Sequence, residues 1–331
     1  MTRAYDNAAD ARFPSGRRNL LINGGFDVWQ RGTSFTADNV YTADRWNSAD
    51  GSGGSPARTL SRQAFAVGQT DVPGEPTYYA RHNQTGASTN SDSNLNQKIE
   101  GVRTGAGQSV TLSFWAKADV SLNIRLRFRQ NFGSGGSSTV NTNIADAFTI
   151  GTSWAKYTYT QTLPSISGKT ISGGNDHLEV QLEFTNASTF TFDIAQMQFE
   201  LGNVATPFEH RSYGEELALC QRYYYNSHLD GDFSDYSGQI MVFAAGTTTF
   251  GATCTVATGR EYPTTMRAVP AVTLYHQDGT ADAVYRVDTG GKITGVTAFA
   301  PTPKGFLYAY KANGFNTGYG YYYGYTADAE L

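Results

Sequence analysis

The sequence predicts an all-β protein made of two β-sandwich, jelly-roll-like domains joined by a short helix. Three observations support this fold class: many segments alternate apolar and polar residues, Gly and Ser clusters separate them, and the composition suits strands and turns. The chain has 331 residues, with 36 Gly, 21 Tyr and 19 Phe but only 16% charged residues. Aromatic residues fit a pleated sheet surface and Gly closes turns. A usual domain is about half as long as this chain, so we expect two domains.

Alternation with a period of two predicts the strands of the first domain. A strand with one buried face sends every second side chain into the core. The Gly-rich and Ser-rich stretches at 51–55, 133–138 and 173–176 then connect such strands. The segments with this pattern are 109–118, 121–130, 156–163, 178–184 and 189–200.

A capping box marks the one helix that we expect. Ser212 is followed three residues later by Glu215, and apolar residues then recur on one helical face. We therefore place a helical linker at 213–225, between a jelly roll at 19–212 and a second β-sandwich at 226–331. The strands expected in the second sandwich are 239–244, 247–256, 271–276, 283–287, 305–312 and 319–326.

Residues 1–18 are polar, small and without periodicity, so we expect an extended arm that becomes ordered by contact with another molecule. The N-terminus lacks the apolar core of a secretory signal, and no segment approaches the ~18 apolar residues of a membrane span. We expect no membrane insertion, and assembly in a cytoplasm.

Charge argues against nucleic acid as a partner. The net charge is −4 and no basic cluster is present, whereas phosphate binding requires patches of Lys and Arg. Arg125, Arg127 and Arg129 alternate along one predicted strand. We interpret them as a solvated or interfacial face of the sheet.

The usual motifs of catalysis are absent, and we expect no enzyme. The sequence contains no HExxH, no GxSxG and no P-loop. The acidic group Asp230, Asp232 and Asp235 does not fit an EF-hand, because the sixth loop position lacks Gly. Two carboxylates at the right separation would be sufficient for a glycosidase, so the sequence alone does not exclude one.

Asn23, Asp27 and Asp193 are candidate ligands of a structural calcium, the one cofactor we consider. They would meet if the first and last strands of the jelly roll were neighbours, and their oxygen atoms are the ligands that calcium prefers. The alternative is that the two aspartates bind loop backbone.

Aromatic side chains are the candidate sugar-binding groups, because the C–H groups of a sugar pack on an aromatic face. Trp29, Trp46 and Trp115 all fall in the first domain. The alternative is that they are core residues, as Trp in a sandwich commonly is. A second candidate is an outward tyrosine patch, with a subunit interface or core as its alternative, made of Tyr308, Tyr310, Tyr319, Tyr321 and Tyr323.

Several sequence blocks, in order, resemble the carbohydrate-binding-module-like jelly roll of bacteriophage tail fibre and related virion proteins. They span nearly the whole chain, which makes the likeness more specific than a single motif would be. The blocks are NLLINGGFDVWQRGTSF (19–35), YTADRW (41–46), SFWAKA (113–118), AQMQFELGNVATPFEH (195–210), YGEELALCQRYYY (213–225) and YTADAEL (325–331).

The resemblance implies a virion structural protein, a tail-fibre, spike or capsid-attached fibre subunit that contacts host surface glycan. It further implies a homotrimer attached to other virion proteins through the arm. In related sugar-binding jelly rolls, the Asn-Gly-x-Phe-acid motif and a late Asp help to hold calcium, although here the late acidic pair is reduced to Asp193-Ile194. The rival hypotheses are a purely structural capsid or tail decoration protein, a secreted carbohydrate-binding module, and a depolymerising tailspike.

Overall fold

The computed structural model describes residues 17–50, 57–86, 93–184, 189–228, 240–243, 253–312 and 320–331, and it forms two compact units. Unit 1 consists of Met1–Asp27, Thr33–Tyr213 and Leu331, and unit 2 of Val28–Gly32 and Gly214–Glu330. The all-β fold class is confirmed. The predicted arm lies outside the described residues apart from its last two positions.

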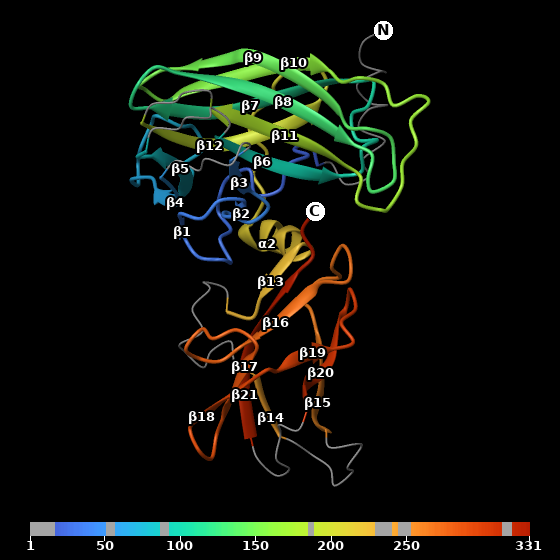
Figure 1. Cartoon of the computed structure of the whole chain (residues 1–331). Helices are drawn as coiled ribbons and strands as arrows, with labels where there is room; N and C mark the ends of the chain where they lie inside the picture. The colour runs from blue at the N-terminus through green and yellow to red at the C-terminus, as the bar shows by residue number, and fades with distance from the viewer. Residues whose placement is uncertain are drawn as a thin grey trace. The chain divides into compact units, whose positions relative to one another are not determined.

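Two antiparallel sheets, A and B, form the two layers of unit 1 (Figure 1). Sheet A has the order β1 (Ser34–Phe35), β4 (Arg58–Ala64), β5 (Tyr78–Gln84), β12 (Phe190–Leu201), β7 (Ser109–Ala118), β10 (Ala155–Thr162). Sheet B has the order β2 (Val40–Tyr41), β3 (Asn47–Asp50), β6 (Ser93–Glu100), β11 (His177–Phe184), β8 (Leu122–Asn131), β9 (Val140–Ile150).

The alternation seen in the sequence decides which face of each strand is buried. In β8, the apolar residues from Leu122 to Phe128 are core, and the arginines between them lie on the outer face of sheet B. There, Arg125 and Arg127 both pair with Glu183 of β11, at 3.2 and 2.8 Å. The arginine face is therefore partly neutralised by the neighbouring strand.

The NGGFD block forms a turn packed against β12. Asn23 and Phe26 adopt left-handed φ values of 57° and 58°, and the indole nitrogen of Trp46 donates to the Asn23 carbonyl at 2.9 Å. The amide of Met197 donates to the Gly24 carbonyl at 2.8 Å. A Cβ atom on Gly24 would lie 2.1 Å from the Met197 oxygen, so only glycine fits.

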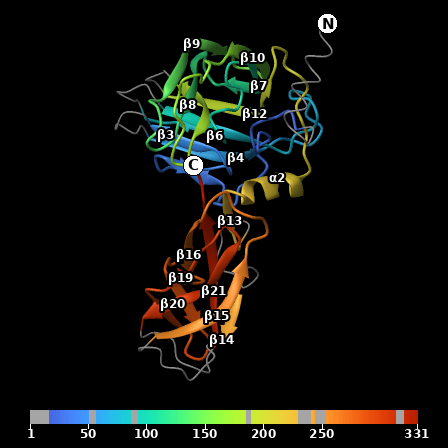
Figure 2. The ribbon, with the colours of Figure 1, turned by 90° about the vertical axis from the view of Figure 1, so that its right-hand side faces the viewer.

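Unit 2 contains the other sheets and the one described helix, α2 (Tyr213–Gln221). Strand β21 pairs with four others, and Figure 2 shows it among them. No helix among the described residues has the length and apolarity needed to cross a membrane. The larger sheet comprises β13 (Tyr224–Asn226), β14 (Ile240–Phe243), β16 (Ala271–Tyr275), β17 (Ala283–Arg286), β18 (Gly291–Thr294) and β21 (Gly320–Asp328); the smaller comprises β15 (Thr253–Glu261), β20 (Gly305–Ala312) and β19 (Thr297–Phe299).

Two expectations for unit 2 need correction. The helix ends at Gln221 rather than at 225, because the tyrosines after it enter β13 and pair with β21. Tyr321 and Tyr323 are not an outward patch, since each is 1% exposed in the core of unit 2. Tyr319 and the side chains of Tyr308 and Tyr310 lie outside the part that the structure describes.

A short segment from the start of the chain is built into unit 2. The Gln30 amide donates to the Tyr224 carbonyl at 2.8 Å, and the Arg31 guanidinium lies 3.5 Å from the centre of the Tyr224 ring. Arg31 also pairs with Asp328 at 3.4 Å and Glu330 at 3.3 Å. The first and last sequence blocks therefore meet in one structural unit.

Candidate functional site

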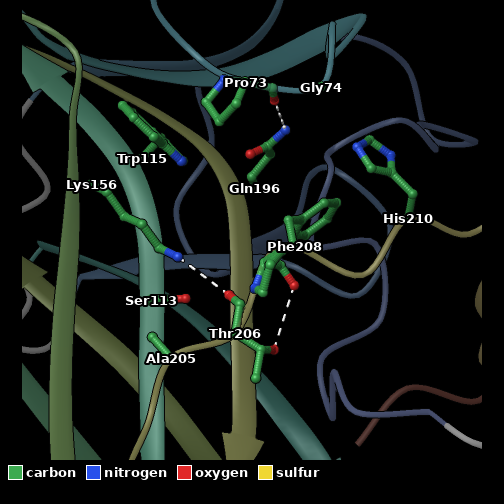
Figure 3. A pocket seen from close by; sticks show the side chains of 11 residues that line it. Pro73, Gly74, Ser113, Trp115, Lys156, Gln196, Ala205, Thr206, Phe208 and His210 are labelled. Carbon is green, nitrogen blue, oxygen red and sulfur yellow. Dashed lines mark hydrogen bonds between the residues drawn. The ribbon is translucent and has the colours of Figure 1, made fainter.

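A pocket of about 450 Å³ lies on the outer face of sheet A, where β12, β7 and β10 are covered at one end by loops (Figure 3). Aromatic and polar side chains line it together, as in a typical small-molecule site. The lining residues are Pro73, Gly74, Ser113, Trp115, Lys156, Gln196, Ala205, Thr206, Pro207, Phe208 and His210.

The floor of the pocket comes from the outward side chains of β7 and β10. Phe114 is fully buried in the core, so its neighbours Ser113 and Trp115 point to the opposite face. Lys156 of β10 lies beside Trp115 in the register of the sheet. A partly exposed indole and an exposed ammonium group thus share the floor.

A β-bulge in β12 supplies the central amide. The pairing of β12 with β7 shifts between Ala195 and Gln198, and the extra residue Gln196 has a φ of 49°. Its amide nitrogen donates to the Pro73 carbonyl at 2.7 Å, and Figure 3 shows the side chain between Trp115 and the 73–74 loop. Bulges re-aim side chains, and strained backbone gathers at functional sites.

Residues 203–210 form the wall that carries Phe208 and His210. Their rings lie 5.2 Å apart at 89°. Hydrogen bonds to β12 fix this wall: Glu200 accepts from the Thr206 amide at 2.9 Å, and Gln198 accepts from the Glu209 amide at 2.8 Å. The wall is therefore held to the sheet before any ligand arrives.

Beyond the pocket, the same outer face carries an ionic cluster. Arg81 donates to both carboxylate oxygens of Asp193, at 2.7 and 2.9 Å, and these hydrogen bonds raise the pKa of Arg81. Lys117 lies 3.9 Å from the same carboxylate and 5.3 Å from the centre of the Trp154 ring. Two cations thus share one buried anion.

The three predicted calcium ligands do not form a site. Asp193 is occupied by Arg81 and Lys117, whereas Gly24, the residue after Asn23, bonds to Met197 of β12. Met197 is four positions after Asp193, which is roughly 13 Å along a strand. The Asn23 side chain already accepts from the Asp27 amide at 2.9 Å and donates to the Asp44 carbonyl at 3.1 Å. Calcium needs about six oxygen ligands, so these residues do not fit it.

The three candidate tryptophans have different environments. Trp46 is 0% exposed against Phe26, and Trp29 is 4% exposed in unit 2. Neither offers a face to a sugar, so the prediction of a sugar platform is wrong for these two. Trp115 alone of the three lies on an open surface, in the pocket.

The pocket lining offers hydrogen-bonding groups beside an aromatic face. Sugar hydroxyl groups could bond with Ser113, Gln196 and His210, while an aromatic face packs against the ring. Among the residues that the structure describes, no Asp or Glu lines the pocket, whereas glycoside hydrolysis normally requires two carboxylates. Four lining residues were not predicted from the sequence: Lys156, Gln196, Phe208 and His210. The last three lie in the sequence block 195–210, which was the one signal that could have indicated them.

No protein-family model matches the sequence, and no curated protein matches it. Among solved structures, the chain is similar to the enzymatically active domain of bacteriophage CBA120 tailspike protein 4, at 13% identity and a TM-score of 0.35, over 56% of this chain and 21% of that one. It is also similar to the CBM22-1 xylan-binding domain of Paenibacillus barcinonensis Xyn10C, at 15% identity and a TM-score of 0.35, over 56% and 96%.

A third similar structure is a cyclase from Fischerella sp. TAU, at 11% identity and a TM-score of 0.37, over 57% of this chain and 100% of that one. The chain spans about a fifth of the tailspike domain and nearly all of the other two. These similarities do not assign a function to this chain.

Proposed function

We propose that the chain is a glycan-binding protein without catalytic activity, and that the pocket over sheet A is where it holds the sugar. The observation that carries this proposal is the pairing of Trp115 with Gln196: an open indole beside an amide that a strained bulge aims into the same pocket. An aromatic platform with a few fixed polar groups is what a sugar ring needs, because it presents apolar C–H faces and a rim of hydroxyl groups.

The pocket is preorganised, which supports binding rather than a role in stability. The Gln196 amide is held by the Pro73 carbonyl, and the opposite wall is held by Glu200 and Gln198. A rigid site loses little entropy when a ligand binds. A left-handed Gln is also costly to the fold, by ~1 kcal/mol or more, so a benefit elsewhere is expected.

Replacing Trp115 with alanine should weaken glycan binding by at least tenfold, because the stacking surface is removed. The measurement is binding of the purified full chain to an array of neutral, amino and acidic oligosaccharides, followed by titration calorimetry with the retained ligands. Trp154→Ala is the matched control, since it removes an indole from the same face but outside the pocket. Equal loss in both variants, or loss only in Trp154→Ala, would contradict the assignment.

A second variant separates binding from stability. Gln196→Gly removes the amide but relieves the left-handed backbone, so the lost hydrogen bond and the released strain nearly cancel, within about 1 kcal/mol. We expect an almost unchanged melting temperature together with weaker sugar binding. A large fall in melting temperature would mean that Gln196 serves the fold.

We further propose that this glycan-binding chain is a virion component, a bacteriophage tail-fibre, spike or capsid-attached fibre subunit that forms a homotrimer and contacts host surface polysaccharide. The support is the ordered series of resembling blocks from residue 19 to residue 331. Weak contacts repeated over many copies would give strong attachment through avidity. A purely structural decoration protein is the alternative, and it predicts no saturable binding to polysaccharide.

Deleting residues 1–18 should abolish incorporation into particles while leaving the chain folded, if that arm docks the protein to the virion. The measurement is the amount of protein that co-sediments with purified particles, with light scattering on the free protein to test for a trimer. Normal incorporation without the arm would remove the docking role.

A further inference from the structure

One cation, Lys156, lines the pocket over sheet A. Lys156 is exposed, and its ammonium group donates to the Thr206 carbonyl at 3.3 Å. Among the residues that the structure describes, no carboxylate lies within salt-bridge distance of it. Figure 3 shows this side chain reaching along the pocket floor beside Trp115.

The acidic groups near the pocket are already engaged and do not line it. Glu200 is 4% exposed and accepts from Thr206 through both carboxylate oxygens. Glu209 accepts from the Asn19 amide and pairs with Arg211. Since the described lining of the cavity contains no Asp or Glu, the charge of Lys156 remains available to a ligand.

The positive charge of Lys156 is opposite in sign to the net charge of the whole chain, which is −4. A negatively charged protein repels acidic polymers at long range. A single cation in the pocket acts only at short range, so its effect is to select among ligands that have already reached the pocket. His210 on the opposite wall adds a ring that can donate through one nitrogen, and no described side chain of the lining is anionic.

We propose that the pocket selects acidic glycans, with the anionic group of one sugar bound by Lys156 and its ring packed on Trp115. This inference rests on the proposed glycan-binding function and names the ligand class of the same pocket. Carboxylate, sulfate and phosphate substituents share the chemistry that an ammonium group recognises. Lys156 and Trp115 are paired across the adjacent strands β10 and β7, so the charge lies within one sugar unit of the stacking surface.

The test begins with the same array of neutral, amino and acidic oligosaccharides, whose acidic members carry uronic acid, sialic acid, sulfate or phosphate groups. We expect the ligands retained by the wild-type chain to be acidic. Neutralising the same ligands, by reducing carboxyl groups to alcohols or by removing sulfate or phosphate, should weaken binding at least tenfold. The chemical treatment that lowers the affinity identifies which anionic group is recognised.

Lys156→Gln should reproduce that loss on the acidic ligand, about tenfold, and should have little effect on its neutralised form. Lys169→Gln is the matched control, because it removes an exposed ammonium group of unit 1 that does not line the pocket. If the retained ligands are neutral, or if Lys156→Gln and Lys169→Gln behave alike, the acidic class is wrong while glycan binding stands. If no ligand is retained, both proposals fail.

Discussion

Replacing Gly24 with alanine is expected to destabilise unit 1 by about 3 kcal/mol or more. The new Cβ atom would lie 2.1 Å from the Met197 carbonyl oxygen, which is backbone and cannot rotate away as a side chain could. The NGGFD turn would have to retreat from β12, and the hydrogen bond from the Met197 amide to the Gly24 carbonyl would be lost. Overpacking of this kind commonly costs 1–3 kcal/mol, and the broken bond adds about 1 kcal/mol.

The measurement is scanning calorimetry of the full chain, in which the transition of unit 1 should shift down by roughly 6–12 °C. Gly151→Ala is the matched control in the same unit. Its Cβ would meet only the Tyr157 hydroxyl at 4.0 Å, so its effect should stay within about 0.5 kcal/mol. If Gly24→Ala costs less than about 1 kcal/mol, the turn is not locked to β12 by this contact.

Lowering the pH from 7.5 to 5 is expected to remove about 2 kcal/mol from the free energy of unfolding of unit 1 through His82 alone. This imidazole is 1% exposed in the core, with ring centres 4.5 Å from Phe184 and 5.5 Å from Phe190. Burial, assisted by the nearby positive charge of Arg58, lowers the pKa of His82 from 6.5 to about 3.

The sign follows from which state binds the proton. His82 stays neutral in the fold at pH 5, whereas the unfolded chain protonates it below pH 6.5, so acid favours unfolding. The stability is fully present above pH 6.5 and is lost as the pH falls towards 3. At pH 5 the cost depends on the unfolded pKa only, because this pH lies well above the folded value.

The pH effect is measured by urea unfolding at pH 7.5 and pH 5, comparing the wild type with His82→Phe, which keeps a ring but cannot titrate. The difference between the two pH values should be about 2 kcal/mol smaller in the variant. His82→Gln serves the same purpose if phenylalanine does not fit. Burial also lowers the pKa of His177, so part of the dependence should persist in either variant. An identical pH dependence in wild type and variant would contradict the role of His82.

Strands with a strict alternation could be predicted from the sequence, and the weakly alternating ones could not. The predicted strand 109–118 has the same first and last residues as β7, because Val110, Leu112 and Phe114 form an unbroken apolar face. Strand β6 escaped prediction, since the buried polar residues Ser93 and Gln97 share the core face with Leu95 and interrupt its apolar pattern. Burial of polar residues in a sheet face depends on neighbouring strands, which local periodicity does not contain.

The pocket over sheet A was only partly foreseeable, for a different reason. The alternation of Phe114 and Trp115 implied that one of them lies on an outer face, but not which neighbours would surround it. Gln196 reaches the pocket because a bulge interrupts the period of two, and Phe208 and His210 come from a loop. Bulges and loops depend on tertiary packing, here on Gly24 beneath β12 and Glu200 beneath the wall.

The segment Val28–Gly32 has a consequence for how the protein is made and inherited. Its partners in unit 2, among them Tyr224 and Asp328, are synthesised some 200 to 300 residues later, so on the ribosome unit 2 cannot close until β21 emerges. Closing such a long loop costs entropy and slows folding. A recombinant that exchanged residues 214–330 alone would have to rebuild the contacts of Arg31 with Tyr224, Asp328 and Glu330.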